Sequence, residues 1–191
     1  MIKHIFLVSI LATCLTSTGC SPLLTATTDG EIRLSPGKRT LGTMIDDQQL
    51  ETIASVNLNK AHPDLLSAHI NVTSYNGVLL LTGQVNSSML KKLAGATVTK
   101  IRNVRQVYNE LQVQGKTSVL SRTNDTWLTT KVKSRLMAAK NVDGGRVKVI
   151  TESGTIYLMG LLSQAEANRA AEIARSTKGV QKVVKAIEYI N

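Results

Sequence analysis

Three side chains suited to binding an anion recur every four residues in one stretch of the chain. Trp127, Lys131 and Arg135 are spaced in this way within NDTWLTTKVKSRLM (124–137). Because an α-helix turns by about 100° per residue, this spacing places all three on one stripe. An indole settles at the boundary between polar and apolar phases, and Lys and Arg bind phosphates. The stripe therefore predicts contact with the anionic head groups of a lipid surface.

The stretch that carries this stripe is expected to be the opening helix of a small domain. Asn124 or Asp125 is the predicted N-cap, since either side chain could accept a free backbone N–H. A second stripe at i, i+4 and i+8 is apolar and should face a core; it consists of Leu128, Val132 and Leu136. The predicted phospholipid-binding residues are Trp127, Lys131, Arg135, Leu128 and Ser134. The alternative is that Trp127 packs against a neighbouring domain while the cations are ordinary solvated charges.

Charge is distributed unevenly along the chain, whose formal net charge is +10. Residues 46–113 contain six Lys and Arg against five Asp and Glu, whereas residues 124–191 contain eleven against six. The basic half is therefore the half that carries Trp127. Such a field favours an anionic partner without distinguishing membrane from nucleic acid or acidic polymer.

Residue patterns typical of enzymes are missing from the sequence. There is no G-x-S-x-G, no H-E-x-x-H, no Cys/His ligand set and no Gly-rich phosphate loop, so we predict no catalytic residue, no metal and no cofactor. His62 and His69 are interpreted as surface or edge residues. With 3% aromatic residues, the chain also offers no stacking platform for single-stranded nucleic acid.

The first twenty residues resemble a bacterial lipoprotein signal. A short polar start is followed by the apolar segment 5–15, which is too short to span a bilayer, and then by STGC ending at Cys20. The resemblance implies cleavage after residue 19 and acylation of Cys20, although Ser17 stands where such signals usually have Leu. The alternative is a plain secretory signal cleaved nearby.

Cysteine usage fits acylation, because the chain has only Cys14 and Cys20 and the first would leave with the signal peptide. Several acyl chains on Cys20 would anchor the protein firmly, since one chain alone binds only marginally. Ser21 after the acylated residue implies, by analogy with such lipoproteins, sorting to the outer membrane. An exported protein hardly meets chromosomal DNA, so the basic surface is better matched to phospholipid than to nucleic acid.

The rest of the chain is a flexible tether followed by an internal repeat. Residues 20–45, rich in Thr, Ser, Gly and Pro, are the predicted tether. Residues 47–58 then align with 125–136, and 71–83 with 148–160. Within the second pair, strands are joined by a two-residue turn at Asn76-Gly77 or Ser153-Gly154, where Gly allows the positive φ of a tight hairpin.

Each repeat predicts the order α-β-β-α-β and an α+β fold. Second helices are expected over 87–101 and 163–177, and final strands over 105–113 and 181–190. Asn103 and Gly179 are predicted to take a left-handed conformation after the helices. Each copy would form a three-stranded sheet with two helices on one face. The predicted domains are 46–113 and 124–191, joined by the linker 114–123.

This spacing resembles the BON domain, a phospholipid-associated module of bacterial envelope proteins. The resemblance rests on the order of the elements: a strand, a turn with Gly, a strand that ends in Gly, a helix, and a final strand with the pattern GV-x-x-V that begins at Gly179. Two copies behind a lipoprotein signal resemble the dual-BON-domain outer-membrane lipoproteins. The segments that match this family are RTLGTMIDD (39–47), NVTSYNGVLLLTGQ (71–84), VYNEL (107–111) and NDTWLTTKV (124–132).

The resemblance implies a non-enzymatic protein anchored in the outer membrane and facing the periplasm. The first helix of its second domain would bind anionic phospholipid of the phosphatidylglycerol or cardiolipin type. The implied role is envelope integrity, with concentration at division sites. The first copy has Gln49, Ile53 and Asn57 at the corresponding positions, so we expect one domain to bind lipid and the other to act as spacer or protein contact. The alternative is an adaptor whose Trp stripe docks on the outer-membrane protein assembly machinery, on a cell-wall enzyme or on a division protein.

Overall fold

The computed structural model describes residues 37–114 and 119–190, with side chains described from Thr123 onward in the second range. The predicted signal peptide, Cys20 and most of the predicted tether lie outside these residues. Among the helices of the described ranges, none combines the length and the apolar character needed to cross a membrane.

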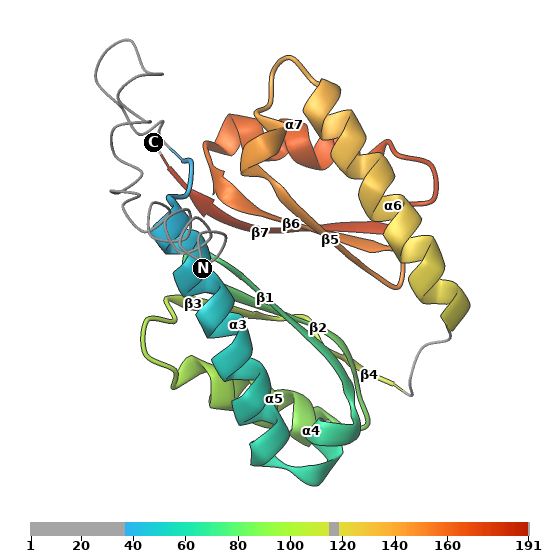
Figure 1. The fold of residues 1–191 in the computed structure, drawn as a ribbon. Coiled ribbons are helices and arrows are strands. Elements are labelled where there is room, and N and C mark those ends of the chain that lie inside the picture. Colours follow the sequence, from blue (N-terminus) through green and yellow to red (C-terminus); the bar gives the residue numbers. More distant parts are fainter. Residues whose placement is uncertain (1–36, 115–118, 191) are drawn as a thin grey trace, which may run out of the picture. The chain divides into compact units, whose positions relative to one another are not determined.

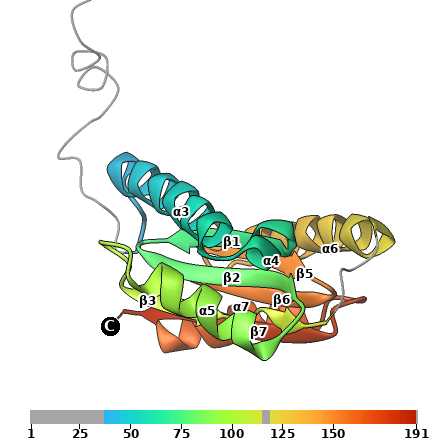
Figure 2. The same cartoon turned by 90° about the horizontal axis from the view of Figure 1, so that it is seen from below.

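The first repeat folds as a mixed sheet with its helices on one face (Figure 1). Strand β2 is central and pairs antiparallel with β1 and parallel with both β3 and β4. The elements, labelled as in Figure 1, are α3 (Leu41–Ala61), α4 (Pro63–Ser67), β1 (His69–Tyr75), β2 (Val78–Val85), α5 (Ser88–Thr99), β3 (Gln106–Asn109) and β4 (Gln112–Val113). Figure 2 shows α3 and α5 of this repeat beside the strands β1 and β2.

The second repeat has the same plan with a three-stranded sheet in the order β5-β6-β7. Its central strand β6 pairs antiparallel with β5 and parallel with β7. The elements are α6 (Val119–Ala138), the short 3-10 helix η2 (Gly144–Arg146), β5 (Lys148–Glu152), β6 (Thr155–Leu162), α7 (Gln164–Arg175) and β7 (Lys182–Tyr189). The predicted α+β fold is confirmed, and the order α-β-β-α-β holds in the second copy, apart from the short 3-10 helix η2. The first copy adds the short helix α4 and the two-residue strand β4, so its sheet has four strands instead of the predicted three.

Local sequence signals explain where several helices begin and end. Ser163 accepts from the backbone N–H of Glu166 while the Glu166 carboxylate accepts from that of Ser163, so the start of α7 is a complete capping box. Helix α3 stops before Pro63, because a residue that precedes proline disfavours the helical conformation. Asn103 and Gly179 have φ of 69° and 102°, which confirms the predicted left-handed positions.

The cores lie where the alternation in the strands predicts. In the first copy Leu79 and Leu81 pack under α3 and α5. In the second copy Ile156 and Leu158 pack under α6 and α7. Both hairpin turns have positive φ at each of their two residues, 52° and 76° in the first and 49° and 73° in the second, as tight type I′ turns require.

Three expected boundaries differ from the structure. Helix α3 begins at Leu41, within the predicted tether, because Thr40 caps it by accepting from the backbone N–H of Thr43 at 3.1 Å. Helix α6 begins at Val119, within the predicted linker. The final strand of the first copy is interrupted between Asn109 and Gln112. At this interruption, the side-chain amide of Asn109 donates to the backbone carbonyl of Lys91 at 2.7 Å.

The face of each sheet that bears no helices is also covered. Side chains from both repeats form one shared apolar cluster, made of Tyr75, Val78, Leu80, Tyr157, Met159 and Ala186. This explains why β2 is buried along its whole length, since both faces of the strand are covered.

Polar contacts surround this cluster and join the two repeats. The buried Glu152 carboxylate accepts from Gln84 at 2.7 Å and from Asn71 at 3.1 Å. Lys148 forms an ion pair with Glu51 at 3.0 Å. Directed contacts of this kind favour one register of the two sheets, because each donor and acceptor would lose its partner in another.

Candidate functional site

The helix that carries the predicted site is fixed to its sheet by a buried carboxylate. Asp125 accepts from the backbone N–H groups of Ser153 at 2.7 Å and Gly154 at 2.8 Å, at the tip of the β5–β6 hairpin. The prediction that Asn124 or Asp125 caps this helix is therefore wrong. The carboxylate holds the hairpin turn instead, and the helix continues past it to Val119.

In the first repeat an Asp carboxylate binds the hairpin turn in the same way, with more hydrogen-bond donors. We call this contact between the carboxylate and the turn the Asp clamp. Asp47 accepts from the backbone N–H groups of Asn76 at 2.8 Å and Gly77 at 2.9 Å. It also accepts from the Ser74 hydroxyl at 2.7 Å and from Arg39 at 2.7 Å. Burial opposes ionisation of Asp47, but the hydrogen bonds from Gly77, Ser74, Arg39 and Asn76 together hold the pKa of its carboxyl below the usual value. The alignment of residues 47–58 with 125–136 thus reflects a shared structural role.

The apolar stripe of α6 is fully buried, as its spacing predicts. Leu128, Val132 and Leu136 have no solvent-exposed surface and belong to the core of the second repeat. Leu128 was also predicted to bind phospholipid, and its burial contradicts that assignment. The loop at Gly179 comes so close to Leu128 that an added Cβ would lie 2.9 Å from its Cδ2 atom, so this side chain has no route to a membrane surface.

Trp127 lies on the exposed side of α6, on a stripe next to the buried one. Its side chain is 56% exposed, which does not fit the alternative in which it packs against the first repeat. The Lys131 ammonium group lies over the indole ring, 4.4 Å from the ring centroid. A cation at this distance is attracted by the negative face of the ring. One turn of helix therefore presents an apolar ring and a positive charge as a single unit.

Arg135 extends the same stripe towards the end of α7. Its guanidinium group donates to the Thr177 hydroxyl at 2.8 Å and to the Ser176 hydroxyl at 3.1 Å. Both acceptors are neutral, so the positive charge is held in place without being neutralised. The predicted trio of Trp127, Lys131 and Arg135 is thus brought together on one face.

Two further residues define the limits of this face. Ser134 is exposed and, seven positions after Trp127, returns to the same side of the helix. Met137 is 60% exposed and was not among the predicted site residues, since it is neither a cation nor an aromatic ring. Its position, ten residues after Trp127, places it about 80° around the helix from the indole, at the edge of the face away from Arg135. We call Trp127, Lys131, Ser134, Arg135 and Met137 the exposed α6 face.

The corresponding face of the first repeat is hollow. A groove of about 410 Å³ runs between α3 and the loop that follows α5. Gln49, Ile53 and Asn57 line it at the positions that match Trp127, Lys131 and Arg135. The absence of charge at these positions is visible in the sequence, whereas the groove is not, because it depends on how the loop after α5 packs.

Both histidines within the described residues occupy structural positions. His62 caps α4 by accepting from the Asp64 backbone N–H at 3.1 Å, and the His69 ring lies 3.8 Å from the Glu152 carboxylate. Within residues 37–114 and 119–190, His, Cys, Asp and Glu form no cluster of three or more suited to a metal ion.

Comparison with known proteins places these features in a family. The BON domain family matches residues 46–115 and 124–191, one match for each repeat. The 21 kDa hemolysin of Actinobacillus pleuropneumoniae is 41% identical over 152 residues, covering 80% of this chain and 78% of that protein. The outer membrane lipoprotein DolP of Haemophilus influenzae is 40% identical over 159 residues, covering 83% and 82%.

More distant likenesses also exist. The osmotically-inducible protein Y of Escherichia coli is 30% identical over 146 residues, covering 75% of this chain and 72% of that protein. The C-terminal domain of CdsD, a structural protein of the type III secretion system of Chlamydia trachomatis, aligns with 76% of this chain and 67% of its own at 13% identity and a TM-score of 0.30. The two family matches, and the identities over most of the length of the relatives, lead to one conclusion: this chain belongs to the BON-domain family and carries two copies of the domain.

Proposed function

We propose that the exposed α6 face binds anionic phospholipid at the surface of a bacterial membrane. The observation that carries the proposal is the pairing of a 56% exposed Trp127 with the Lys131 ammonium group, 4.4 Å from the ring centroid. The indole would enter the boundary between head groups and acyl chains, while Lys131 and Arg135 would meet phosphates. Ser134 is small enough to let the surface approach between them.

Rigid presentation of this face supports the proposal. Leu128, Val132 and Leu136 fix one side of α6 in the core, and Asp125 fixes the helix to the β5–β6 turn. The positions of the ring and the charges are therefore set before a lipid arrives, so little conformational entropy is lost on binding.

The attraction expected from this face alone is modest. Each cation near an anionic surface contributes about 1 kcal/mol, so Lys131 and Arg135 with the indole give weak binding. We propose that acyl chains on Cys20 anchor the protein in the outer membrane, with the domains in the periplasm. The name of the relative from Haemophilus influenzae, an outer membrane lipoprotein, supports this anchoring. A tethered domain meets the lipid at a high effective concentration, so a weak contact becomes sufficient.

We further propose a non-enzymatic role in the integrity of the envelope, including at division sites. A supporting observation is that the core side chains of the second repeat are engaged in packing, while Trp127 and Met137 on the exposed α6 face remain open to solvent. Cells in which Trp127→Glu replaces the parent protein are expected to become sensitive to detergent. Normal detergent resistance in such cells would contradict this role.

Vesicle binding tests the lipid proposal directly, because Trp127 is the only tryptophan in the chain. A chain that begins at Ser21 carries no acyl group and is mixed with vesicles of phosphatidylglycerol or phosphatidylcholine. Phosphatidylglycerol should shift the tryptophan emission to shorter wavelength, and brominated acyl chains should quench it. Phosphatidylcholine should do neither at the same concentration.

Matched variants complete the test. Trp127→Glu is expected to weaken sedimentation with phosphatidylglycerol vesicles by more than about tenfold, since it removes the apolar ring and adds a charge that the surface repels. Gln49→Glu, at the same position of the first repeat, should leave binding unchanged. Unaltered binding by folded Trp127→Glu would refute the proposal. If no vesicle changed the tryptophan emission, and cross-links from position 127 reached a protein, the adaptor function would be favoured instead.

A further inference from the structure

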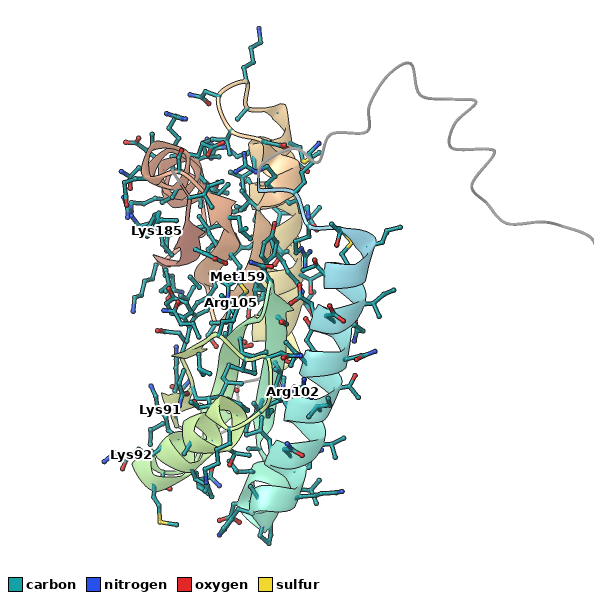
Figure 3. All side chains as sticks on the ribbon, turned by 90° about the vertical axis from the view of Figure 1, so that its left-hand side faces the viewer. Lys91, Lys92, Arg102, Arg105, Met159 and Lys185 are labelled. Carbon is teal, nitrogen blue, oxygen red and sulfur yellow. The ribbon has the colours of Figure 1, made fainter. Side chains whose placement is uncertain are left out.

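The groove of the first repeat is a candidate ligand site separate from the lipid contact proposed for the second repeat. Its volume of about 410 Å³ lies within the range of pockets that bind small ligands or a few side chains. It is lined by Asp46, Gln49, Leu50, Ile53, Asn57, Thr97, Lys100, Ile101, Arg102 and Asn103. Arg102 is labelled in Figure 3, together with Lys91 and Lys92 of α5, which do not line the groove.

Apolar side chains form part of this lining. Ile53 is 45% exposed, although three positions away Leu50 is buried in the core. Ile101 is partly buried and packs against that core from the other side of the groove. An apolar side chain of a ligand that settled between Ile53 and Ile101 would remove their surface from water, which is favourable.

Hydrogen-bonding groups interrupt the apolar surface. Within the described part of the chain, the side-chain amides of Gln49, Asn57 and Asn103 form no hydrogen bond that would occupy them. An acyl chain lying in the groove would bury these amides without partners, which is unfavourable. A peptide backbone offers N–H and C=O groups along its length and could satisfy them. The polar lining therefore favours a peptide over a lipid chain.

Charge on the groove selects the kind of peptide. Lys100 and Arg102 are exposed, and no carboxylate in residues 37–114 or 119–190 pairs with either of them. Asp46 is the single acidic residue of the lining. Two cations against one carboxylate leave the groove net positive, so it is complementary to an acidic segment.

The second repeat shows that the groove is a particular feature of the first. There, Arg135 reaches from α6 to Thr177 and Ser176, across the region that is open in the first repeat. Asn57 is too short to do the same, and Lys100 stands where the second repeat has Ser176. We propose that the groove of the first BON domain binds an acidic peptide segment of a partner protein, with one apolar side chain inserted between Ile53 and Ile101.

Nuclear magnetic resonance with defined peptides tests this proposal. The probes are two acetylated and amidated nonapeptides that repeat glutamate-glutamate-leucine or lysine-lysine-leucine three times. They are titrated into the ¹⁵N-labelled chain that begins at Ser21. The glutamate peptide is expected to shift amide signals at Gln49, Ile53, Ile101 and Arg102, whereas the lysine peptide should leave them unchanged. No localised shift with the glutamate peptide, or equal shifts with both, would overturn the proposal.

A charge reversal provides the matched variants. Lys100→Glu with Arg102→Glu should weaken binding of the glutamate peptide by about tenfold or more and allow the lysine peptide to bind. Lys91→Glu with Lys92→Glu changes the net charge by the same amount away from the groove and should retain the parent's preference. Loss of binding in both double variants would overturn the proposal, since it would reveal a diffuse field. Monomeric dihexanoyl phosphatidylglycerol that shifted the groove signals more strongly than the peptide would also overturn it, in favour of a lipid site.

Discussion

The two BON domains share their buried positions and differ on one exposed helix face. In both, an Asp near the start of the first long helix holds the hairpin turn, through Asp47 in one and Asp125 in the other. In both, that helix buries a stripe of small or branched apolar residues. The fold therefore places strict demands on the inner side of the helix.

The outer side of the same helix is under no such demand. It carries Trp127 and Lys131 in the second domain, and Gln49 and Ile53 in the first. Because the inner contacts hold the helix in the same way, these replacements change the surface without changing the scaffold. The comparison teaches that a duplicated domain separates the residues that build it from the residues available for binding.

The largest effect is expected from replacing the Asp residue that holds the hairpin turn in both domains. Asp125→Ala should lower the free energy of unfolding by about 3 kcal/mol, because the buried backbone N–H of Gly154 and the partly buried one of Ser153 lose their charged acceptor. Asp47→Ala should be more damaging, since Arg39 and Ser74 also lose a partner. Urea unfolding followed by circular dichroism measures both. Equal stability of parent and variants would show that the clamp does not hold the hairpins.

A graft of the exposed α6 face onto the first domain tests whether the difference in surface residues decides lipid binding. Gln49→Trp, Ile53→Lys and Asn57→Arg are introduced together into the Trp127→Glu variant. We expect part of the affinity for phosphatidylglycerol vesicles to return, to within about tenfold of the parent. Recovery should be incomplete because Lys100 would repel the introduced arginine, whereas Ser176 accepts from Arg135 in the second domain.

Intrinsic fluorescence reports the outcome of the graft, since the introduced tryptophan would be the only one in the chain. Emission that shifts to shorter wavelength with phosphatidylglycerol would show that the first domain has gained the contact. Emission that stays unchanged, in a folded variant, would mean that features beyond these three side chains decide lipid binding.

Much of the fold followed from periodicity in the sequence. Alternation in the strands identified the faces of β2 and β6 that meet the helices, because side chains in a strand point to opposite sides in turn. The Asn76-Gly77 and Ser153-Gly154 turns were predictable because few residues adopt positive φ. The burial of Leu128 was predicted by its helical spacing, which should have excluded it from the lipid-binding set.

Other features depended on contacts between distant segments. The sequence around Asp125 predicts a helix cap. Only the position of the hairpin turn shows that its carboxylate accepts from the backbone N–H of Gly154 instead. The sequence does contain a pattern that indicates the shared apolar cluster. Val78–Leu81 is apolar at every position, and a strand of this kind is covered on both faces. The groove beside Ile53 had no signal, because its walls come from residues about fifty positions apart.

A smaller effect is expected at Arg135, whose two roles are separable. Arg135→Ala should weaken vesicle binding by about fivefold through the loss of one cation, and should lower the free energy of unfolding by about 1 kcal/mol through the lost hydrogen bonds. Arg135→Lys keeps the charge but not the forked geometry that reaches Thr177 and Ser176 together. It should retain vesicle binding while losing stability. Equal loss of vesicle binding in both variants would show that geometry, rather than charge, attracts the lipid.

The smallest expected effect is the response of the Asp47 clamp to acid. Hydrogen bonds hold the pKa of Asp47 below its ordinary value of 3.8, so the carboxylate stabilises the folded state above that pH. This contribution should be lost as the pH falls through the lowered pKa, because protonation then favours unfolding. Asp47→Asn has no such proton to bind, so its deficit in stability relative to the parent should shrink between pH 6 and pH 3, by urea unfolding at each pH. A deficit that stayed constant over this range would show that the charge of Asp47 does not strengthen the clamp, and that its shape and hydrogen-bonding capacity alone hold the turn.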